Sequence, residues 1–436
     1  MPHALCAMLN TKEEQQMKNG LNVRCILSKD TVLATVTEQA VYALVDIKAG
    51  SGTASGSMPA NFSLVLDRSG SMDGEKMENL KEAVGYVVDH LSDNDLVSVT
   101  IFDDQVETLI PSQLAQNRHE IKAKLANVIA RGGTQVSDGL KAGLAEVRKG
   151  LAKDRVNRIL LLTDGQTWDD EDACLKLSDE AGKQGIAITS IGIGDEWNEK
   201  LLLQLAEQSR GNSHWIQNPI SILDVFQQEV EGMQAVAAMN LRVTARMSRG
   251  VKPYKVYVTA PMIVDVSSKA VNNSTVMTEL GSLDGKKGQS ILIEARIPAQ
   301  KTGQFRIGQV EVTYDIPSQG ITGRTVKTDL FVALTKDAAA ATKVNAEVMN
   351  LVEKVSAFKL QTRALTEAAA GNIAAATQKL QSAATVLLNL GEEDLAEAAE
   401  REILSLNRTG ALTSAGTKKL EYGTRKLTQV MTQAIK

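Results

Sequence analysis

The spacing of apolar residues changes twice along this chain of 436 residues, and each change predicts a domain boundary. Residues 21–29 and 32–49 alternate between apolar and polar positions, as strands with one buried face do. A segment rich in Gly and Ser then completes the region 21–57 and predicts a linker. From residue 58 the alternation gives way to short apolar runs separated by helical patterns.

The region 58–236 predicts an α/β domain. Four apolar runs predict buried strands: Phe62–Asp67, Leu96–Phe102, Ile159–Thr163 and Ile186–Gly192. Apolar residues at helical spacing predict helices from about Glu75 and near 118–130, 136–150, 171–184, 198–208 and 219–236. Because strands alternate with helices, we expect a Rossmann-like domain, with a mainly parallel sheet and helices on both faces.

Alternation returns in the region 237–335, where short strands and turn signals predict a second part of a β structure. The predicted strands lie near 241–245, 256–258, 290–297, 308–314 and 325–334. The simplest architecture is a β-sandwich, formed with residues 21–57, into which the α/β domain is inserted. Two unrelated β segments are the alternative.

The last region, 336–436, has helical periodicity and predicts a C-terminal bundle of three or four helices. Ala338–Ala341 is expected to open its first long helix, and Gly371, Gly391 and Gly410 are expected to separate the helices. Residues 1–20 form a short N-terminal segment that carries no predicted fold.

Oxygen-bearing side chains follow two of the predicted strands. Asp67, Ser69 and Ser71 come at the end of the first, Asp164 ends the third, and Thr134 lies in the glycine-rich turn between them. Carboxyl ends of parallel strands share one sheet edge, so these side chains are expected to meet there. Carboxylate and hydroxyl oxygens suit a hard cation such as Mg²⁺, and this set leaves room for an outside oxygen. The alternative is a set of turn and cap residues without metal.

These five residues, in this order and spacing, resemble the metal-ion-dependent adhesion site of the von Willebrand factor A domain, over roughly residues 58–235. The resemblance implies that Ser69, Ser71 and Thr134 contact Mg²⁺, with Mn²⁺ or Ca²⁺ as alternatives. It implies that Asp67 and Asp164 hold the ion directly or through water. An acidic residue of a partner protein then fills the last position. Bacterial proteins with this domain often work beside AAA+ ATPases or in multiprotein assemblies.

Three further residues are candidates for a rim around this site. Arg68 is expected to select an acidic partner or to be a solvated charge. Asp103 is expected to support the site or to form a turn. Trp168 precedes the acidic stretch 169–172, which predicts either a partner anchor with acidic neighbours or a helix start.

Composition narrows the possible functions. A formal net charge of -4, with no dense basic patch, excludes a typical nucleic-acid-binding surface. No run approaches the ~20 apolar residues of a membrane-spanning helix. Three scattered cysteines predict neither a disulfide framework nor a zinc site, and a cytoplasmic location is expected.

The sequence therefore predicts a non-enzymatic adaptor or scaffold that captures an acidic side chain of a partner protein through Mg²⁺. No catalytic residue and no organic cofactor are assigned. One alternative is a scaffold whose metal site only stabilises the loops. The other is a divalent-metal hydrolase, which the hydroxyl-rich ligand set and the absence of a nearby His disfavour.

Overall fold

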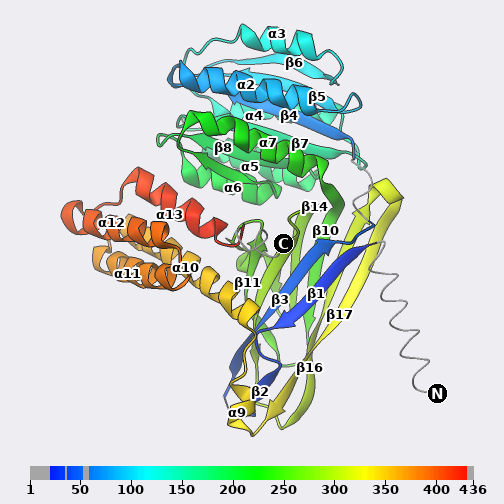
Figure 1. Ribbon diagram of the computed structural model, residues 1–436, viewed down its shortest axis with the longest axis vertical. Helices are drawn as coiled ribbons and strands as arrows, with labels where there is room; N and C mark the ends of the chain where they lie inside the picture. The colour runs from blue at the N-terminus through cyan, green and yellow to red at the C-terminus, as the bar shows by residue number, and fades with distance from the viewer. Residues whose placement is uncertain (1–19, 35–36, 53–57, 168, 430–436) are drawn as a thin grey trace. The chain divides into compact units, whose positions relative to one another are not determined.

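The structure, a computed structural model, describes residues 20–34, 37–52, 58–167 and 169–429. These residues fall into two compact units (Figure 1). Among the described residues, those within 56–236 and 317–320 form one unit, and those within 1–55, 237–316 and 321–436 form the other. The chain thus leaves the second unit after residue 55, completes residues 56–236 of the α/β unit, and returns to the second unit with strand β10 (Val236–Met247).

The α/β unit contains one sheet with the strand order β6-β5-β4-β7-β8-β9. All neighbouring strands run parallel except β6, which pairs antiparallel with β5. The strands are β4 (Ala60–Asp67), β5 (Leu96–Phe102), β6 (Val106–Leu114), β7 (Val156–Thr163), β8 (Ala187–Ile193) and β9 (Ser213–Ile216). Every residue of β4 and β7 is buried, as expected for central strands covered on both faces.

The helices of this unit form two packed groups. Helix α2 packs against α7, whereas α4 packs against α5, and α5 against α6. Their bounds are α2 (Glu75–His90), α3 (Arg118–Ala126), α4 (Val136–Lys149), α5 (Glu171–Lys183), α6 (Glu199–Ser209) and α7 (Ile222–Gln234). Gly143 of α4 lies so close to the sheet that a Cβ there would come within 2.2 Å of Val65 Cγ2. A larger residue at 143 would therefore push α4 away from β4.

The sequence predictions of these elements need several corrections. Strand β6 was not predicted, because Pro111 and frequent polar residues hide the alternation of an antiparallel edge strand. The sheet is consequently mixed. Strand β9 was also missed, since its four residues are too few to show a period. The helix expected over 118–130 ends at Ala126, and a loop that exposes Ile129 follows.

The second unit contains two sheets whose inward residues form one hydrophobic core. The strand orders are β1-β3-β15-β11-β12 and β13-β14-β10-β16-β17-β2. Strands from before and after the α/β unit pair directly, since β3 runs antiparallel to β15 and β2 runs parallel to β17. The principal strands are β1 (Leu21–Leu27), β2 (Thr31–Leu33), β3 (Gln39–Ala49), β11 (Lys252–Ala260), β14 (Thr275–Asp284), β15 (Gln289–Ile297), β16 (Gly303–Ile316) and β17 (Ile321–Thr335), and β12 (Val264–Asp265) and β13 (Val271–Asn272) are short.

The four long helices described in this unit follow its strands: α10 (Ala346–Ala369), α11 (Ile373–Asn389), α12 (Glu393–Thr409) and α13 (Ser414–Lys426). Each packs against the next, and α13 returns to α10. The segment Ala338–Ala341 does not open the first long helix, as the sequence suggested, but forms the separate short helix α9. Helix α10 begins later because Asn345 caps it, accepting a hydrogen bond from the main-chain N–H of Val348 at 3.1 Å. Among the described helices, none has the length and apolar character needed to cross a membrane.

Helix α7 is fixed to the sheet by a buried polar network around Glu229. Its carboxylate accepts hydrogen bonds from Arg158 at 3.1 Å, Thr189 at 2.7 Å and Asn212 at 2.8 Å, and it lies 2.9 Å from His214 Nε2. Burial opposes ionisation of Glu229, but the hydrogen bond from His214 and the charge of Arg158 outweigh it. They hold the pKa of this carboxyl well below its usual range.

Replacement of this carboxylate should destabilise the α/β unit strongly. Glu229→Gln leaves the Arg158 guanidinium buried without its counter-ion, so we expect the free energy of unfolding to fall by about 3 kcal/mol or more near neutral pH. Because the native pKa is depressed, the stabilisation is present above the unfolded-state pKa of about 4.3 and is lost as the pH falls toward the native value. Urea denaturation of the wild type and of Glu229→Gln, from about pH 7 to about pH 3, measures this difference in the free energy of unfolding and its dependence on pH.

The matched control is Asp224→Asn, a similar neutralisation at an exposed position of the same helix. It should change the free energy of unfolding by less than about 1 kcal/mol. Equal effects of Glu229→Gln and Asp224→Asn, or an effect of Glu229→Gln that does not shrink on acidification, would contradict the role given to this network.

Candidate functional site

The carboxyl ends of β4 and β7 form the point where the order of the sheet reverses. From β4 the chain proceeds to β5 on one side and later to β7 on the other. Asp67 is the last residue of β4, and Asp164 comes directly after β7. Ligands of open α/β sheets bind at this kind of crevice. The fold therefore places both predicted carboxylates where a ligand site is expected.

The predicted serines converge on one of these carboxylates. Ser71 Oγ donates a hydrogen bond to Asp164 Oδ1 at 2.7 Å, and Ser69 Oγ lies 3.4 Å from the same oxygen. The two hydroxyl oxygens are 3.1 Å apart. Residues separated by more than 90 positions in the sequence thus present three oxygens to one small volume.

Asp67 lies beneath these hydroxyls and shapes their loop. Its Oδ1 accepts a hydrogen bond from the main-chain N–H of Ser69 at 2.7 Å, and its Oδ2 accepts one from Thr163 Oγ1 at 2.6 Å. The side chain is fully buried, and burial raises the pKa of Asp67 to about 6 despite the hydrogen bonds from Thr163 and Ser69. Asp67 therefore both orders the loop and places negative charge below it.

Thr134 belongs to the same cluster. Its loop is tied to the first one by hydrogen bonds from Gly70 N to Gly132 O at 3.0 Å and from Arg131 N to Arg68 O at 2.7 Å. Gly132 adopts a φ of 72°, which favours glycine in this turn. A Cβ on Gly165 would lie 2.9 Å from Thr134 Oγ1, so the threonine hydroxyl faces the segment after β7 at close range. All five predicted residues meet at this edge.

The donor chemistry of this cluster fits a hard divalent cation. It combines two carboxylates with three hydroxyls, and Thr134 Oγ1 makes no hydrogen bond to another residue that the structure describes. No group of three or more His, Cys, Asp or Glu side chains with metal-binding geometry occurs among the described residues. Binding of a cation here would therefore depend on the hydroxyls, as oxygen-ligand sites for Mg²⁺ allow.

Sequence reasoning missed a cation that is part of the cluster. The Lys76 ammonium forms an ion pair with Asp164 Oδ2 and donates a hydrogen bond to the main-chain oxygen of Ser71 at 3.1 Å. Lys76 lies in the first turn of α2, five positions after Ser71. That position, in the first turn of the helix that follows the loop, is the signal that could have identified it.

Two of the three residues predicted for a partner rim, Arg68 and Asp103, are buried and form internal ion pairs. Arg68 is only 6% exposed, and its guanidinium pairs with Asp103 at 2.9 Å and with Glu107 at 3.2 Å. Asp103 is also buried and accepts a second pairing from Arg131 at 3.1 Å. Both side chains therefore brace the loops from within, because buried charges require partners. For Asp103, support of the site was one of the two predicted alternatives. The third predicted residue, Trp168, lies outside the described residues.

Asp103 owes its ionisation to these contacts. Burial alone would raise the pKa of Asp103. The hydrogen bond from the main-chain N–H of Gln105 and the charges of Arg131 and Arg68 lower this pKa by more, so that the net shift is downward. The adjacent Asp104 accepts a hydrogen bond from Gly133 N at 2.9 Å. The loop after β5 is therefore joined to the loop that carries Thr134.

Asp170 connects the segment after β7 to the start of α4. Its Oδ2 accepts hydrogen bonds from Ser137 N at 2.7 Å and Gln135 Nε2 at 3.0 Å. Thr167 Oγ1 donates to the other oxygen of Asp170 and accepts from Val136 N at 3.2 Å. The acidic stretch thus supplies a carboxylate that holds the helix directly following Thr134.

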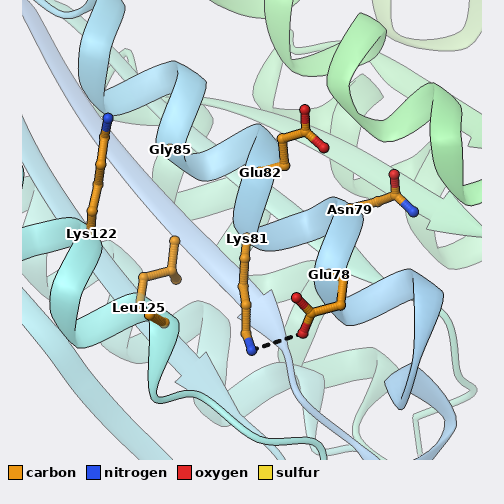
Figure 2. A pocket seen from close by; sticks show the side chains of 8 residues that line it. Glu78, Asn79, Lys81, Glu82, Gly85, Lys122 and Leu125 are labelled. Atoms are coloured by element: carbon orange, nitrogen blue, oxygen red, sulfur yellow. Dashed lines mark hydrogen bonds and ion pairs between the residues drawn. The ribbon is translucent and has the colours of Figure 1, made fainter.

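A separate groove of about 490 Å³ lies between α2 and α3 (Figure 2). Lys81 forms an ion pair with Glu78 along it at 3.1 Å. The residues around it are Glu78, Asn79, Lys81, Glu82, Gly85, Lys122, Leu125 and Ala126. None of the five predicted ligands is among them, and its mixed charges do not converge on one point. The groove is therefore not part of the cluster at the sheet edge.

Comparison with known proteins identifies two regions of the chain. Residues 61–228 match the family model of the von Willebrand factor type A domain. Residues 346–430 match the family described as Sll0103-like, C-terminal alpha-helical domain. The α/β unit is thus a von Willebrand factor type A domain, and the four-helix segment corresponds to a helical domain found in other proteins.

Relatives and solved structures agree with this division. The protein sll0103 of Synechocystis sp. is 34% identical over 268 residues, which are 61% of this chain and 64% of that protein. YfbK of Escherichia coli is 23% identical over 53% of this chain and 41% of its own length. The matched regions therefore span less than two thirds of these relatives.

A von Willebrand factor type A protein from Catenulispora acidiphila has a similar fold, with a TM-score of 0.77 and 18% identity over 94% of this chain and 97% of that chain. The ArnB paralog VWA2 from Sulfolobus acidocaldarius gives a TM-score of 0.57 with 16% identity, over 94% of this chain and 99% of its own. The likeness of fold therefore extends beyond the α/β unit.

The bracing role of Asp170 can be tested by removing its charge. Asp170→Asn retains the size of the side chain but offers fewer acceptors to Ser137 N, Gln135 and Thr167. We expect the free energy of unfolding to fall by about 1–3 kcal/mol and amide hydrogen exchange to accelerate at residues 134–137. The matched control is Asp169→Asn at the exposed neighbouring position, where Asn tolerates the φ of 52°. Equal exchange rates in both variants would exclude this role.

Proposed function

We propose that this von Willebrand factor type A domain protein is a metal-dependent adaptor or scaffold, which binds a partner protein through Mg²⁺ at the edge of its α/β sheet. The observation that supports the proposal most directly is the convergence of Ser69, Ser71 and Asp164 within 3.4 Å, with Thr134 beside them. Oxygens from three separate loops meet there and lie at the ligand-binding edge of the fold.

The five residues of the cluster would bind the ion in two ways. The hydroxyls of Ser69, Ser71 and Thr134 would bind it as neutral ligands, and Asp67 and Asp164 would hold it directly or through water. Thr163 and the main chain of Ser69 orient Asp67. The ion pairs of Arg68 and Arg131 with Asp103 fix the loops on which the hydroxyls are placed.

A bound Mg²⁺ supplies positive charge and a coordination position for an outside oxygen. Since most of the ligands are neutral, the carboxylate of an exposed Asp or Glu on a partner is the ligand that the site favours. A contact of this kind is strengthened where the partner excludes water from it. We propose that this capture, rather than catalysis, is the activity of the site, since hydroxyls stand where a hydrolytic centre commonly has carboxylates.

Thr134→Val tests the metal site with little effect on folding. The substitution removes a hydroxyl that bonds to no other described residue and preserves the shape of the side chain. The dissociation constant for Mn²⁺, measured by electron paramagnetic resonance, should increase by about tenfold or more, while the melting temperature in EDTA stays nearly unchanged.

Thr100→Val on β5 is the matched control. Thr100 is fully buried, its Oγ1 has no hydrogen-bond partner in the described structure, and it lies in the middle of its strand. The dissociation constant of the Thr100→Val protein for Mn²⁺ should equal that of the wild type. Equal Mn²⁺ affinity in Thr134→Val and Thr100→Val would contradict the proposed ligand set.

The capture step is tested with a pull-down from cell extract. Wild-type protein in Mg²⁺ should retain a partner that is absent in EDTA and absent with Asp67→Ala in either condition. A partner retained in all conditions would indicate a scaffold whose metal site only stabilises its loops. An AAA+ ATPase or a component of a larger assembly is the class of partner expected among retained proteins.

A further inference from the structure

Lys76 is the one residue of the cluster to which the proposed metal site gives no role. The side chain is 29% exposed, and its ammonium reaches Asp164, whose own side chain is 0% exposed. The same ammonium donates a hydrogen bond to the main-chain oxygen of Ser71, a residue whose side-chain hydroxyl is one of the proposed ligands. It therefore contacts both the strand-end carboxylate and the loop that presents the serine hydroxyls.

We propose that Lys76 is a resident cation of the site that keeps Mg²⁺ binding weak and the binding of an acidic partner strong. This inference rests on the proposed function and adds a regulation of the same site. Lys76 acts as a positioning residue in the absence of metal and as a second positive charge in its presence.

In the absence of metal, the site would otherwise contain two buried carboxylates with little compensation. Asp67 receives its hydrogen bonds from neutral groups, Ser69 N and Thr163 Oγ1. Asp164 is instead neutralised by Lys76 on one oxygen, while its other oxygen accepts from Ser71. A buried carboxylate without a counter-ion is strongly unfavourable. Lys76 thus holds the loops in place before a metal ion arrives.

In the presence of metal, the same ammonium changes the charge of the complex. Two carboxylates and one ammonium leave a single negative charge for a dication to neutralise, so the bound site carries one net positive charge. Without Lys76 the two carboxylates and the dication would cancel. Lys76 consequently repels the metal ion and attracts an incoming carboxylate.

Removal of Lys76 is expected to strengthen metal binding and to weaken carboxylate binding. Damage to the fold would instead weaken both. For Lys76→Met we expect the dissociation constant for Mn²⁺ to fall by about tenfold, because the competing cation is gone. We expect the affinity of the Mn²⁺-loaded protein for acetate to fall by about fivefold, because the net positive charge is gone. The melting temperature in EDTA should decrease, because Asp164 is left unpaired.

The experiment uses the full chain and measures three quantities at a pH near 8. Mn²⁺ binding is followed by electron paramagnetic resonance, acetate binding by the relaxation of water protons around bound Mn²⁺, and apo stability by thermal unfolding in EDTA. Lys76→Arg retains the charge and should restore wild-type metal and acetate affinities. Lys81→Met, on the same helix, removes an ammonium that pairs with Glu78 instead and should leave both affinities unchanged.

The outcomes separate this inference from the proposed function. Tighter Mn²⁺ binding with weaker acetate binding in Lys76→Met supports it. Unchanged or weaker Mn²⁺ binding in Lys76→Met, with normal binding by the wild type, overturns this inference and leaves the metal site intact. Absence of Mn²⁺ binding by the folded wild type overturns both proposals. If Lys76→Met does not fold, Lys76→Gln, which can still donate to Ser71 O, carries the same predictions.

Discussion

The candidate site depends on the burial of one carboxylate, that of Asp164, at the end of a central strand. Its side chain is inaccessible to water, so each oxygen must find a donor within the protein. Ser71 supplies one and Lys76 supplies the other. This requirement draws the first loop and the start of α2 toward the end of β7, and it explains why residues distant in the sequence meet at one point.

The surrounding loops are held by a second group of buried charges. Asp103 and Asp170 each join two loops, the first through Arg68 and Arg131 and the second through Ser137 N and Gln135. None of these contacts requires a bound ligand. The hydroxyls of the site are therefore positioned by the protein itself, which reduces the conformational cost of binding an ion or a partner.

The sequence was sufficient to predict those strands and site residues whose signals lie within a short segment of the chain. Asp67, Ser69 and Ser71 follow a continuous apolar run, and the structure brings them together with Asp164 as the pattern indicated. The edge strand β6 was missed because Pro111 and its frequent polar residues obscure the alternation of a strand. Arg68 and Lys76 have long side chains whose partners lie on other elements, so only the fold reveals that both are committed to ion pairs. Whether the cluster binds metal stays a prediction.

The most direct test of the account is a crystal structure of the protein grown with Mn²⁺, with diffraction data collected at the manganese absorption edge. We predict an anomalous peak within bonding distance of the Ser69, Ser71 and Thr134 hydroxyls, with Lys76 still near Asp164 and an open position toward solvent. Well-ordered loops without a peak at saturating Mn²⁺, or a peak bound only by carboxylates elsewhere on the surface, would contradict the central claim that these hydroxyls form a metal site.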